Sequence, residues 1–214
     1  MKVPENPSRY WLQKEIEYYA DKLPVDSMVL DAGGGMCAYK QHFTHCNYES
    51  ADFAQMGLNY DKLSYICDLT KIPVDDNRYD FILFTQVMEH VPEPELVLYE
   101  LLRILKPLGK IFCSAPVFYH EHGAPYDFYR YTYFGLKYLF SKVGFTIDKI
   151  ERMEGFFQTS SYLLDYIRDN LPDDQFTAKN IFGQYAEKFR ELEMKNKITD
   201  KGIPINYIVV ATKL

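Results

Sequence analysis

The sequence lacks the features that mark several common classes of protein. Its 214 residues contain 24 Lys and Arg against 30 Asp and Glu, a net charge of −6, without a local cluster of basic residues. A nucleic-acid groove needs such a cluster, so nucleic acid is not an expected partner. No apolar run approaches the roughly 18 residues that a membrane span requires. Internal repeats and low-complexity segments are also missing.

Cysteine is scarce as well. The four cysteines are scattered and show no C-x-x-C spacing, and no apolar stretch follows the basic residue near the N-terminus. Without a secretory signal, disulfide bonds are not expected, and we predict reduced thiols and a cytoplasmic protein. The sequence makes no prediction of the oligomeric state.

Aromatic residues, in contrast, are abundant. The chain has 19 Tyr, 15 Phe and 1 Trp, which together make up 16% of it, while apolar residues reach 47% and charged residues 25%. The last two values are typical of a globular domain. Many of the tyrosines lie between Tyr119 and Tyr138, so this segment needs an explanation beyond ordinary packing.

Short apolar strands alternate with helical patterns along most of the chain. This alternation predicts an α/β protein built from βαβ units, with a parallel sheet. The last apolar run has no helix that would return it parallel to a neighbour, so we expect it to be antiparallel. We predict a Rossmann-like seven-stranded sheet with helices on both faces, with strands at 28–30, 48–52, 65–67, 79–84, 111–115, 145–150 and 205–212.

A glycine-rich turn follows the first predicted strand and precedes a predicted short helix at 38–45. Its sequence is Asp31-Ala32-Gly33-Gly34-Gly35, and glycines allow a backbone to approach a ligand closely. The pattern fits the dinucleotide motif G-x-G-x-x-G/A through Ala38, with Asp52 at a distance suited to a ribose. It also fits the acidic-x-Gly-x-Gly loop of S-adenosylmethionine (SAM) enzymes, which the acid before the first glycine favours.

Several further motifs follow in a fixed order, and together they resemble the class I SAM-dependent methyltransferases of the type 11 group. The similarity covers most of residues 25–155 and the terminal strand. It is carried by VLDAGGGMC (29–37), Asp52, YICDLTKIPVDDNRYDFILFTQVMEHVPEP (65–94) and ELLRILKPLGKIFCSAP (100–116). One departure is Cys37, which stands where the family has its third loop glycine.

The resemblance implies SAM as the cofactor and assigns residues to it. Asp31 and the turn would hold the methionine end, Asp52 the ribose hydroxyls and Asp68 the adenine amine; a carboxylate with two acceptor oxygens matches a vicinal diol. The complete set of implied cofactor residues is Asp31, Gly33, Gly34, Gly35, Asp52, Phe53, Asp68, Leu69, Thr85 and Gln86. Glu89-His90 resembles a family turn, which we interpret as a helix-start hydrogen bond that shapes the cofactor wall.

The acceptor is expected beside the segment after the fifth strand, because ligands of open α/β sheets lie beyond the carboxyl ends of the strands. His122 and His120 are the candidate general bases for a hydroxyl acceptor, with His122 first because Gly123 leaves room beside it. A zinc site of His120, His122 and Asp127 lacks any supporting Cys or His cluster, so no metal is predicted.

The same segment, HEHGAPYDFYRYT (120–132), resembles a type 11 subgroup with the pattern H-x-x-P-Y-D-F-x-R-Y-T. Members of that subgroup often accompany genes for glycan synthesis, which implies a sugar-like hydroxyl as the acceptor. We interpret Asp127 and Arg130 mainly as a loop-fixing pair, and expect Tyr126 and Arg130 to touch the acceptor as well.

The predicted organisation is one methyltransferase domain over 1–214. It comprises an N-terminal helical cap (1–24), a SAM-binding core (25–155), a helical insertion or lid (156–200) and a terminal strand (201–214). The expected function is methyl transfer from SAM to a small molecule, most simply at oxygen. Two alternatives remain open: an NAD-dependent oxidoreductase, and a SAM-binding protein without catalytic activity.

Overall fold

The computed structural model describes residues 6–55, 60, 62–200 and 202–214 of the chain. It divides the chain into two compact units, one formed by residues 1–14 and 152–206 and the other by residues 15–151 and 207–214. The single-domain organisation expected from the sequence stays a prediction.

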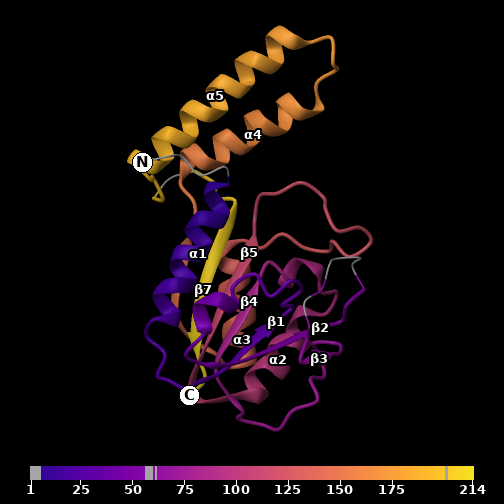
Figure 1. Ribbon diagram of the computed structural model, residues 1–214, viewed down its shortest axis with the longest axis vertical. Helices are drawn as coiled ribbons and strands as arrows, with labels where there is room; N and C mark the ends of the chain where they lie inside the picture. The colour runs from indigo at the N-terminus through magenta and orange to yellow at the C-terminus, as the bar shows by residue number, and fades with distance from the viewer. Residues whose placement is uncertain (1–5, 56–59, 61, 201) are drawn as a thin grey trace. The chain divides into compact units, whose positions relative to one another are not determined.

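A seven-stranded sheet organises the larger unit, and its strand order is β3-β2-β1-β4-β5-β7-β6 (Figure 1). Strands β1 to β5 pair in parallel where they are neighbours, with Asp31 opposite Ser50 of β2 and Leu83 of β4. The chain order reverses between β1 and β4, which is where ligands bind in sheets of this kind. The strands are β1 (Met28–Ala32), β2 (Asn47–Asp52), β3 (Tyr65–Ile66), β4 (Tyr79–Thr85), β5 (Leu105–Pro116), β6 (Thr146–Arg152) and β7 (Asn206–Thr212).

Strand β7 is antiparallel to its neighbour β5. Beyond its end, Lys213 donates its backbone N–H to Gly109, and Leu108 donates to Lys213, so the two segments exchange hydrogen bonds in both directions. The predicted α/β fold, with seven strands and an antiparallel last strand, is confirmed. The largest boundary difference is at β5, which begins at Leu105, six residues before the predicted start at Ile111.

Helices cover both faces of the sheet, and the alternation along β4 shows how. Ile82 and Phe84 pack in one buried cluster with residues of α2 (Pro94–Ile104) and α3 (Tyr133–Val143). Phe81 points to the other face, where its ring lies 6.3 Å from that of Tyr19, near the end of α1 (Pro7–Ala20), and 6.2 Å from that of Phe43. Successive side chains of a strand point to opposite faces, so an unbroken apolar run is buried on both sides.

The smaller unit contains a helical hairpin of α4 (Phe156–Asn170) and α5 (Phe176–Lys195). The rings of Phe157 and Phe189 stack between the helices, 5.9 Å apart. The buried carboxylate of Glu193 accepts hydrogen bonds from the backbone N–H groups of Gly155 (2.7 Å) and Gln158 (3.2 Å), which satisfies the start of α4. The lid function expected for 156–200 stays a prediction.

Among the described residues, the longest helices are too short or too polar to cross a bilayer.

Candidate functional site

The glycine-rich turn is shaped by positive φ angles. Gly33 has φ +77° and Gly35 has φ +48°, which glycine adopts without the steric cost of a Cβ. Backbone hydrogen bonds hold the turn against β2, because Gly33 and Gly34 both donate their N–H to the carbonyl of Ala51. A Cβ on Gly33 would lie only 2.6 Å from Cγ1 of Val87, so this position has no room for a side chain.

The predicted short helix at 38–45 is smaller than expected. Only a 3₁₀ helix, η1, forms over Lys40–Phe43. Cys37, the residue in place of the family's third glycine, has φ +50°, and this left-handed conformation interrupts helical geometry before η1 begins. The backbone N–H of Gly35 donates a hydrogen bond to Oδ2 of Asp52, at 3.1 Å.

Asp31 lies at the end of β1 and is 3% exposed. Burial raises the pKa of its carboxyl to about 6, although a hydrogen bond from the Tyr48 hydroxyl to Oδ2, at 2.5 Å, acts in the opposite direction. A buried carboxylate of this kind gains from a cationic partner, because a nearby positive charge favours its ionised form.

Asp52 follows Asp31 at the end of the neighbouring strand and is also buried. Its Oδ1 accepts from the backbone N–H of Ala54 at 2.8 Å and its Oδ2 from that of Gly35, which fixes the carboxylate plane. Each oxygen keeps a lone pair for a ligand hydroxyl. The structure therefore places Asp31 and Asp52 near the carboxyl ends of the neighbouring strands β1 and β2, and their contacts with a cofactor stay predictions.

Asp68 and Leu69 lie two and three residues beyond β3. Asp68 is exposed, and its Oδ1 accepts from both the backbone N–H and the hydroxyl of Thr70 at 2.8 Å, as in an Asx turn. Leu69 is buried. Asp68 thus has a local structural role, and its contact with an adenine stays a prediction.

Thr85 ends β4, and Gln86 follows it with φ +56°. The backbone N–H of Gln86 donates to the Ser114 carbonyl at 2.9 Å, and its side-chain amide donates to the Ser114 hydroxyl at 3.0 Å. These contacts fix the backbone at the end of β4, where the sequence predicts contact with the methionine part of the cofactor.

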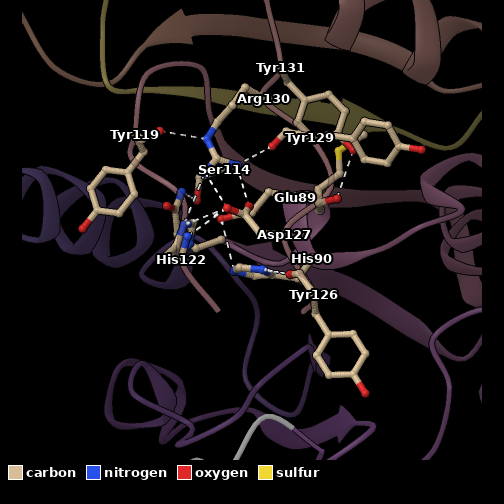
Figure 2. Close-up of polar contacts among 12 residues, drawn as sticks. Glu89, His90, Ser114, Tyr119, His122, Tyr126, Asp127, Tyr129, Arg130 and Tyr131 are labelled. Carbon is tan, nitrogen blue, oxygen red and sulfur yellow. Dashed lines mark hydrogen bonds and ion pairs between the residues drawn. The ribbon is translucent and has the colours of Figure 1, made fainter. Parts of the chain in front are cut away.

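The segment after β5 is irregular and is held by an ion pair. Arg130 donates to both carboxylate oxygens of Asp127, at 2.6 and 2.8 Å, and to the backbone carbonyls of Tyr119, His120 and Tyr129 (Figure 2). The Arg130 guanidinium accordingly holds the pKa of Asp127 well below its usual range. The loop-fixing role predicted for this pair agrees with these contacts, and a direct contact of Arg130 with an acceptor stays a prediction.

His122 is the better placed of the two candidate bases. Its backbone N–H donates to Oδ2 of Asp127 at 2.9 Å, and its Nδ1 lies 3.7 Å from the same oxygen. Partial burial lowers the pKa of the imidazole, so the ring is neutral at neutral pH and can accept a proton. His120 is exposed, with its ring stacked on Tyr119 at 4.4 Å.

Glu89 and His90, on the 3₁₀ helix η2 (Met88–His90), are the residues whose role the sequence misjudged. Glu89 is fully buried, and neither carboxylate oxygen has a hydrogen-bond partner among the residues that the structure describes, so the helix-start hydrogen bond is not formed. Burial raises the pKa of this carboxyl to about 7. The ring of His90 lies 4.7 Å from that of His122 (Figure 2). The two residues are 32 positions apart in the sequence, and no motif signals their contact.

The segment after β5 also reaches the cofactor side of the site. The ring of Tyr126, a predicted acceptor contact, lies edge-on to the ring of Phe53, a predicted cofactor contact, with 5.3 Å between centroids. The backbone N–H groups of Phe128 and Tyr129 donate to the carbonyl of Glu89. The two predicted sets of residues therefore meet along one edge of the sheet.

The fold is similar to that of solved SAM-dependent methyltransferases. A SAM-dependent methyltransferase from Archaeoglobus fulgidus superimposes on the chain with a TM-score of 0.61 at 17% identity, and the match covers 96% of this chain and 94% of that one. Residues 30–113 match the family model described as a methyltransferase domain. This match covers 84 of the 214 residues and runs from β1 into β5.

Curated relatives are similar over shorter stretches. The chain is 29% identical over 92 residues to a ubiquinone biosynthesis O-methyltransferase of Coxiella burnetii, which is 42% of this chain and 35% of that protein. It is 33% identical over 61 residues to a ubiquinone/menaquinone biosynthesis C-methyltransferase of Desulfotalea psychrophila, or 28% of this chain and 23% of that protein. The chain thus spans about a third or less of the length of these relatives.

Proposed function

We propose that this protein is a SAM-dependent methyltransferase that methylates a small molecule at a hydroxyl oxygen. The observation that carries the proposal is the meeting of two groups of residues at one sheet edge. Asp31 and Asp52 end adjacent parallel strands beside a glycine turn with no room for a side chain, and His122 stands on the segment after β5.

The residues at this edge fit SAM. The buried Asp31 carboxylate suits the ammonium of the methionine part, since it gains from a positive charge. The two oxygens of Asp52 are oriented by backbone amides and suit the ribose hydroxyls. Phe53 would flank the adenosine, Asp68 and Leu69 the adenine, and Thr85 and Gln86 the methionine backbone. The cofactor supplies a methyl group that its positively charged sulfur activates.

The chemical step is a displacement at the methyl carbon. The acceptor oxygen forms a bond to this carbon, the carbon–sulfur bond breaks, and its electron pair stays on sulfur, which leaves S-adenosylhomocysteine. The protein's contribution is chiefly to align the oxygen, carbon and sulfur atoms. His122 accepts the hydroxyl proton, and Asp127, which contacts the same residue, favours the charged imidazole that results.

The acceptor class rests on similarity. The likeness of the segment after β5 to the glycan-associated subgroup supports a sugar-like hydroxyl, and the O-methyltransferase relative supports oxygen as the methylated atom. The C-methyltransferase relative supports carbon as a second candidate. Tyr126 and Arg130 are the residues that we assign to acceptor contact.

The first test is calorimetric titration of the full chain with SAM and, separately, with NAD. We expect SAM to bind and NAD not to bind. NAD binding without SAM binding would overturn the proposal in favour of an oxidoreductase. SAM binding without turnover of sugar, phenol or other hydroxyl acceptors would leave a non-catalytic SAM-binding protein.

The second test separates the acceptor side from the cofactor side. His122→Ala should lower the rate of methyl transfer by about 10²-fold or more, a common contribution of a general base. Its affinity for SAM should stay within about twofold of the original, because His122 is not among the assigned cofactor residues. The control is His45→Ala. His45 lies before β2, at the opposite end of the sheet, so this change should alter neither the rate of methyl transfer nor the affinity for SAM. An unchanged rate for His122→Ala would remove His122 from the chemistry.

A further inference from the structure

Three side chains with metal-binding chemistry come together on the acceptor side of the site. Glu89, His90 and His122 each offer one ligand atom, and these atoms all lie within 4.8 Å of one another. Two of them belong to η2 and the third to the segment after β5 (Figure 2). This group differs from the zinc site of His120, His122 and Asp127 that the sequence analysis considered. It contains Glu89 and His90, which follow β4, in place of His120 and Asp127.

Glu89 gives the first reason to assign a cation here. Its side chain is fully buried, and both oxygens lack a hydrogen-bond partner among the described residues. Buried carboxylates are normally paired, hydrogen-bonded or bound to a metal, because an isolated one loses its hydration without compensation. The nearest basic group is His90, whose Nε2 lies 3.8 Å from Oε1 of Glu89.

His90 is oriented as a ligand. Its Nδ1 lies 2.5 Å from the backbone carbonyl oxygen of Tyr126. A carbonyl oxygen only accepts, so Nδ1 carries the proton and Nε2 keeps its lone pair on the side that faces Glu89. Metal-binding histidines commonly donate their other ring N–H to a carbonyl or carboxylate in this way.

His122 has the same arrangement. Its Nδ1 lies 3.2 Å from the carbonyl oxygen of His120, nearer than the 3.4 Å to Nη2 of Arg130. The closer contact favours a proton on Nδ1 and leaves Nε2 for a ligand. The Asp127 carboxylate beside this ring is in turn fixed by Arg130, so both histidines of the group have outer contacts that orient them.

We propose that Glu89, His90 and His122 bind one divalent first-row transition-metal ion. Two imidazoles and one carboxylate are a mixed nitrogen and oxygen set, which favours ions such as Zn²⁺, Co²⁺ or Fe²⁺ over Mg²⁺ and Ca²⁺. Three protein ligands leave at least one coordination position open, as in catalytic rather than structural sites.

The role of the ion rests on the proposed function. An acceptor hydroxyl on the open position loses its proton more readily, because the cation stabilises the resulting oxyanion. With the ion bound, His122 is a metal ligand in place of its role as general base in the metal-free step, and the hydroxyl proton passes to solvent. This role commits the acceptor to an oxygen nucleophile, and it predicts that a chelator lowers turnover without lowering SAM affinity.

The test is a titration of the full chain, freed of metal by dialysis against a chelator, with Co²⁺. We expect visible absorption bands of protein-bound Co²⁺ that saturate at about one equivalent and vanish when Zn²⁺ is added. Excess Mg²⁺ should not remove them, and removal by Mg²⁺ would overturn the choice of a transition metal. Glu89→Gln and His122→Ala should each weaken Co²⁺ binding by about tenfold or more, the size seen on loss of contacts that support a metal.

The control is His45→Ala, which should bind Co²⁺ as the original protein does. His122 is partly exposed, so His122→Ala decides the matter if Glu89→Gln fails to fold, as judged by circular dichroism. Absence of Co²⁺ binding, or equal binding by the folded variants, overturns the inference. SAM binding is measured on the same samples to separate the two proposals. SAM binding without Co²⁺ binding would overturn only the metal site. Co²⁺ binding without SAM binding would overturn only the proposed function.

Discussion

The two halves of the site are built in different ways. The glycine-rich turn after β1 is held by backbone groups, with the amides of Gly33 and Gly34 on the carbonyl of Ala51 in the neighbouring strand. The segment after β5 is held by a side chain, the Arg130 guanidinium, which bridges Asp127 and three backbone carbonyls. Backbone hydrogen bonds to the neighbouring strand position the first half, while the Asp127–Arg130 ion pair and the backbone hydrogen bonds of Phe128 and Tyr129 to the Glu89 carbonyl position the second.

The difference extends to the carboxylates. Among the residues that the structure describes, no basic group pairs with Asp31, and burial raises the pKa of its carboxyl to about 6. Asp127 is paired with Arg130, and its pKa is lowered. The Asp31 carboxylate thus favours the binding of a cation, whereas the charge of the Asp127 carboxylate is already balanced by Arg130. This contrast fits a cofactor side that receives a charged ligand and an acceptor side that is organised in advance.

The largest expected loss of stability comes from Gly33→Ala, which changes the glycine-rich turn that backbone hydrogen bonds hold. The new methyl group would overlap the Val87 side chain and force a positive φ on alanine. Overpacking and the left-handed conformation together cost roughly 4–5 kcal/mol of the free energy of unfolding. Chemical denaturation measures this loss, and SAM affinity should fall with it.

Two further variants separate the contributions. Gly33→Ala with Val87→Ala should recover the part due to overlap but not the part due to φ. Gly34→Ala, whose Cβ would lie 3.1 Å from the nearest atom at an ordinary φ, should cost less than Gly33→Ala. Equal losses at the two glycines would show that the turn does not depend on the conformation of Gly33.

The side-chain-held half should respond next most strongly, to Arg130→Ala. This change leaves the mostly buried Asp127 carboxylate without its partner, which costs roughly 3–4 kcal/mol of stability. Methyl transfer should fall further than stability alone explains, because the segment that carries His122 loses its anchor. Thermal unfolding and turnover at saturating SAM, on the same preparation, measure the two effects.

Arg103→Ala is a matched control for this prediction. Arg103, on α2, also bridges carboxylates and carbonyls, those of Glu100, Asp76, Ile72 and Val74, and none of these four belongs to the assigned site residues. It should lose a similar stability and keep its turnover for each folded molecule. A similar loss of turnover in both variants would contradict the special role of Arg130.

The contrast between the two halves of the site also explains which of its features can be predicted from the sequence and which cannot. The parallel α/β sheet, its antiparallel last strand and the positions of Asp31 and Asp52 at strand ends follow from local patterns, because parallel register carries residues at strand ends to one edge. The contact of Glu89 and His90 with His122 does not follow from local sequence patterns. It depends on how a loop without regular structure folds back onto η2, through contacts such as Phe128 N–H to the Glu89 carbonyl, and no periodic pattern records such a contact.

The smallest predicted effect concerns pH and tests the two carboxylates against each other. The pKa of Asp31 in the folded protein, about 6, lies above its value of 3.8 in the unfolded chain. The folded state therefore retains a proton that the unfolded state has lost, and the free energy of unfolding falls as the pH rises from about 4 to about 6, by roughly 2–3 kcal/mol. Asp31→Asn should remove this slope in denaturation curves.

Asp127 contributes with the opposite sign and in a different window. Because its pKa is lowered in the folded protein, the stability that it provides is present above about pH 4 and is lost as the pH falls below that value. Asp127→Asn should therefore leave the slope between pH 4 and 6 intact. Saturating SAM should abolish the Asp31 slope, since an ammonium beside this carboxylate restores its ionised form. A slope that persists with SAM bound would place the methionine ammonium elsewhere and remove Asp31 from the cofactor site.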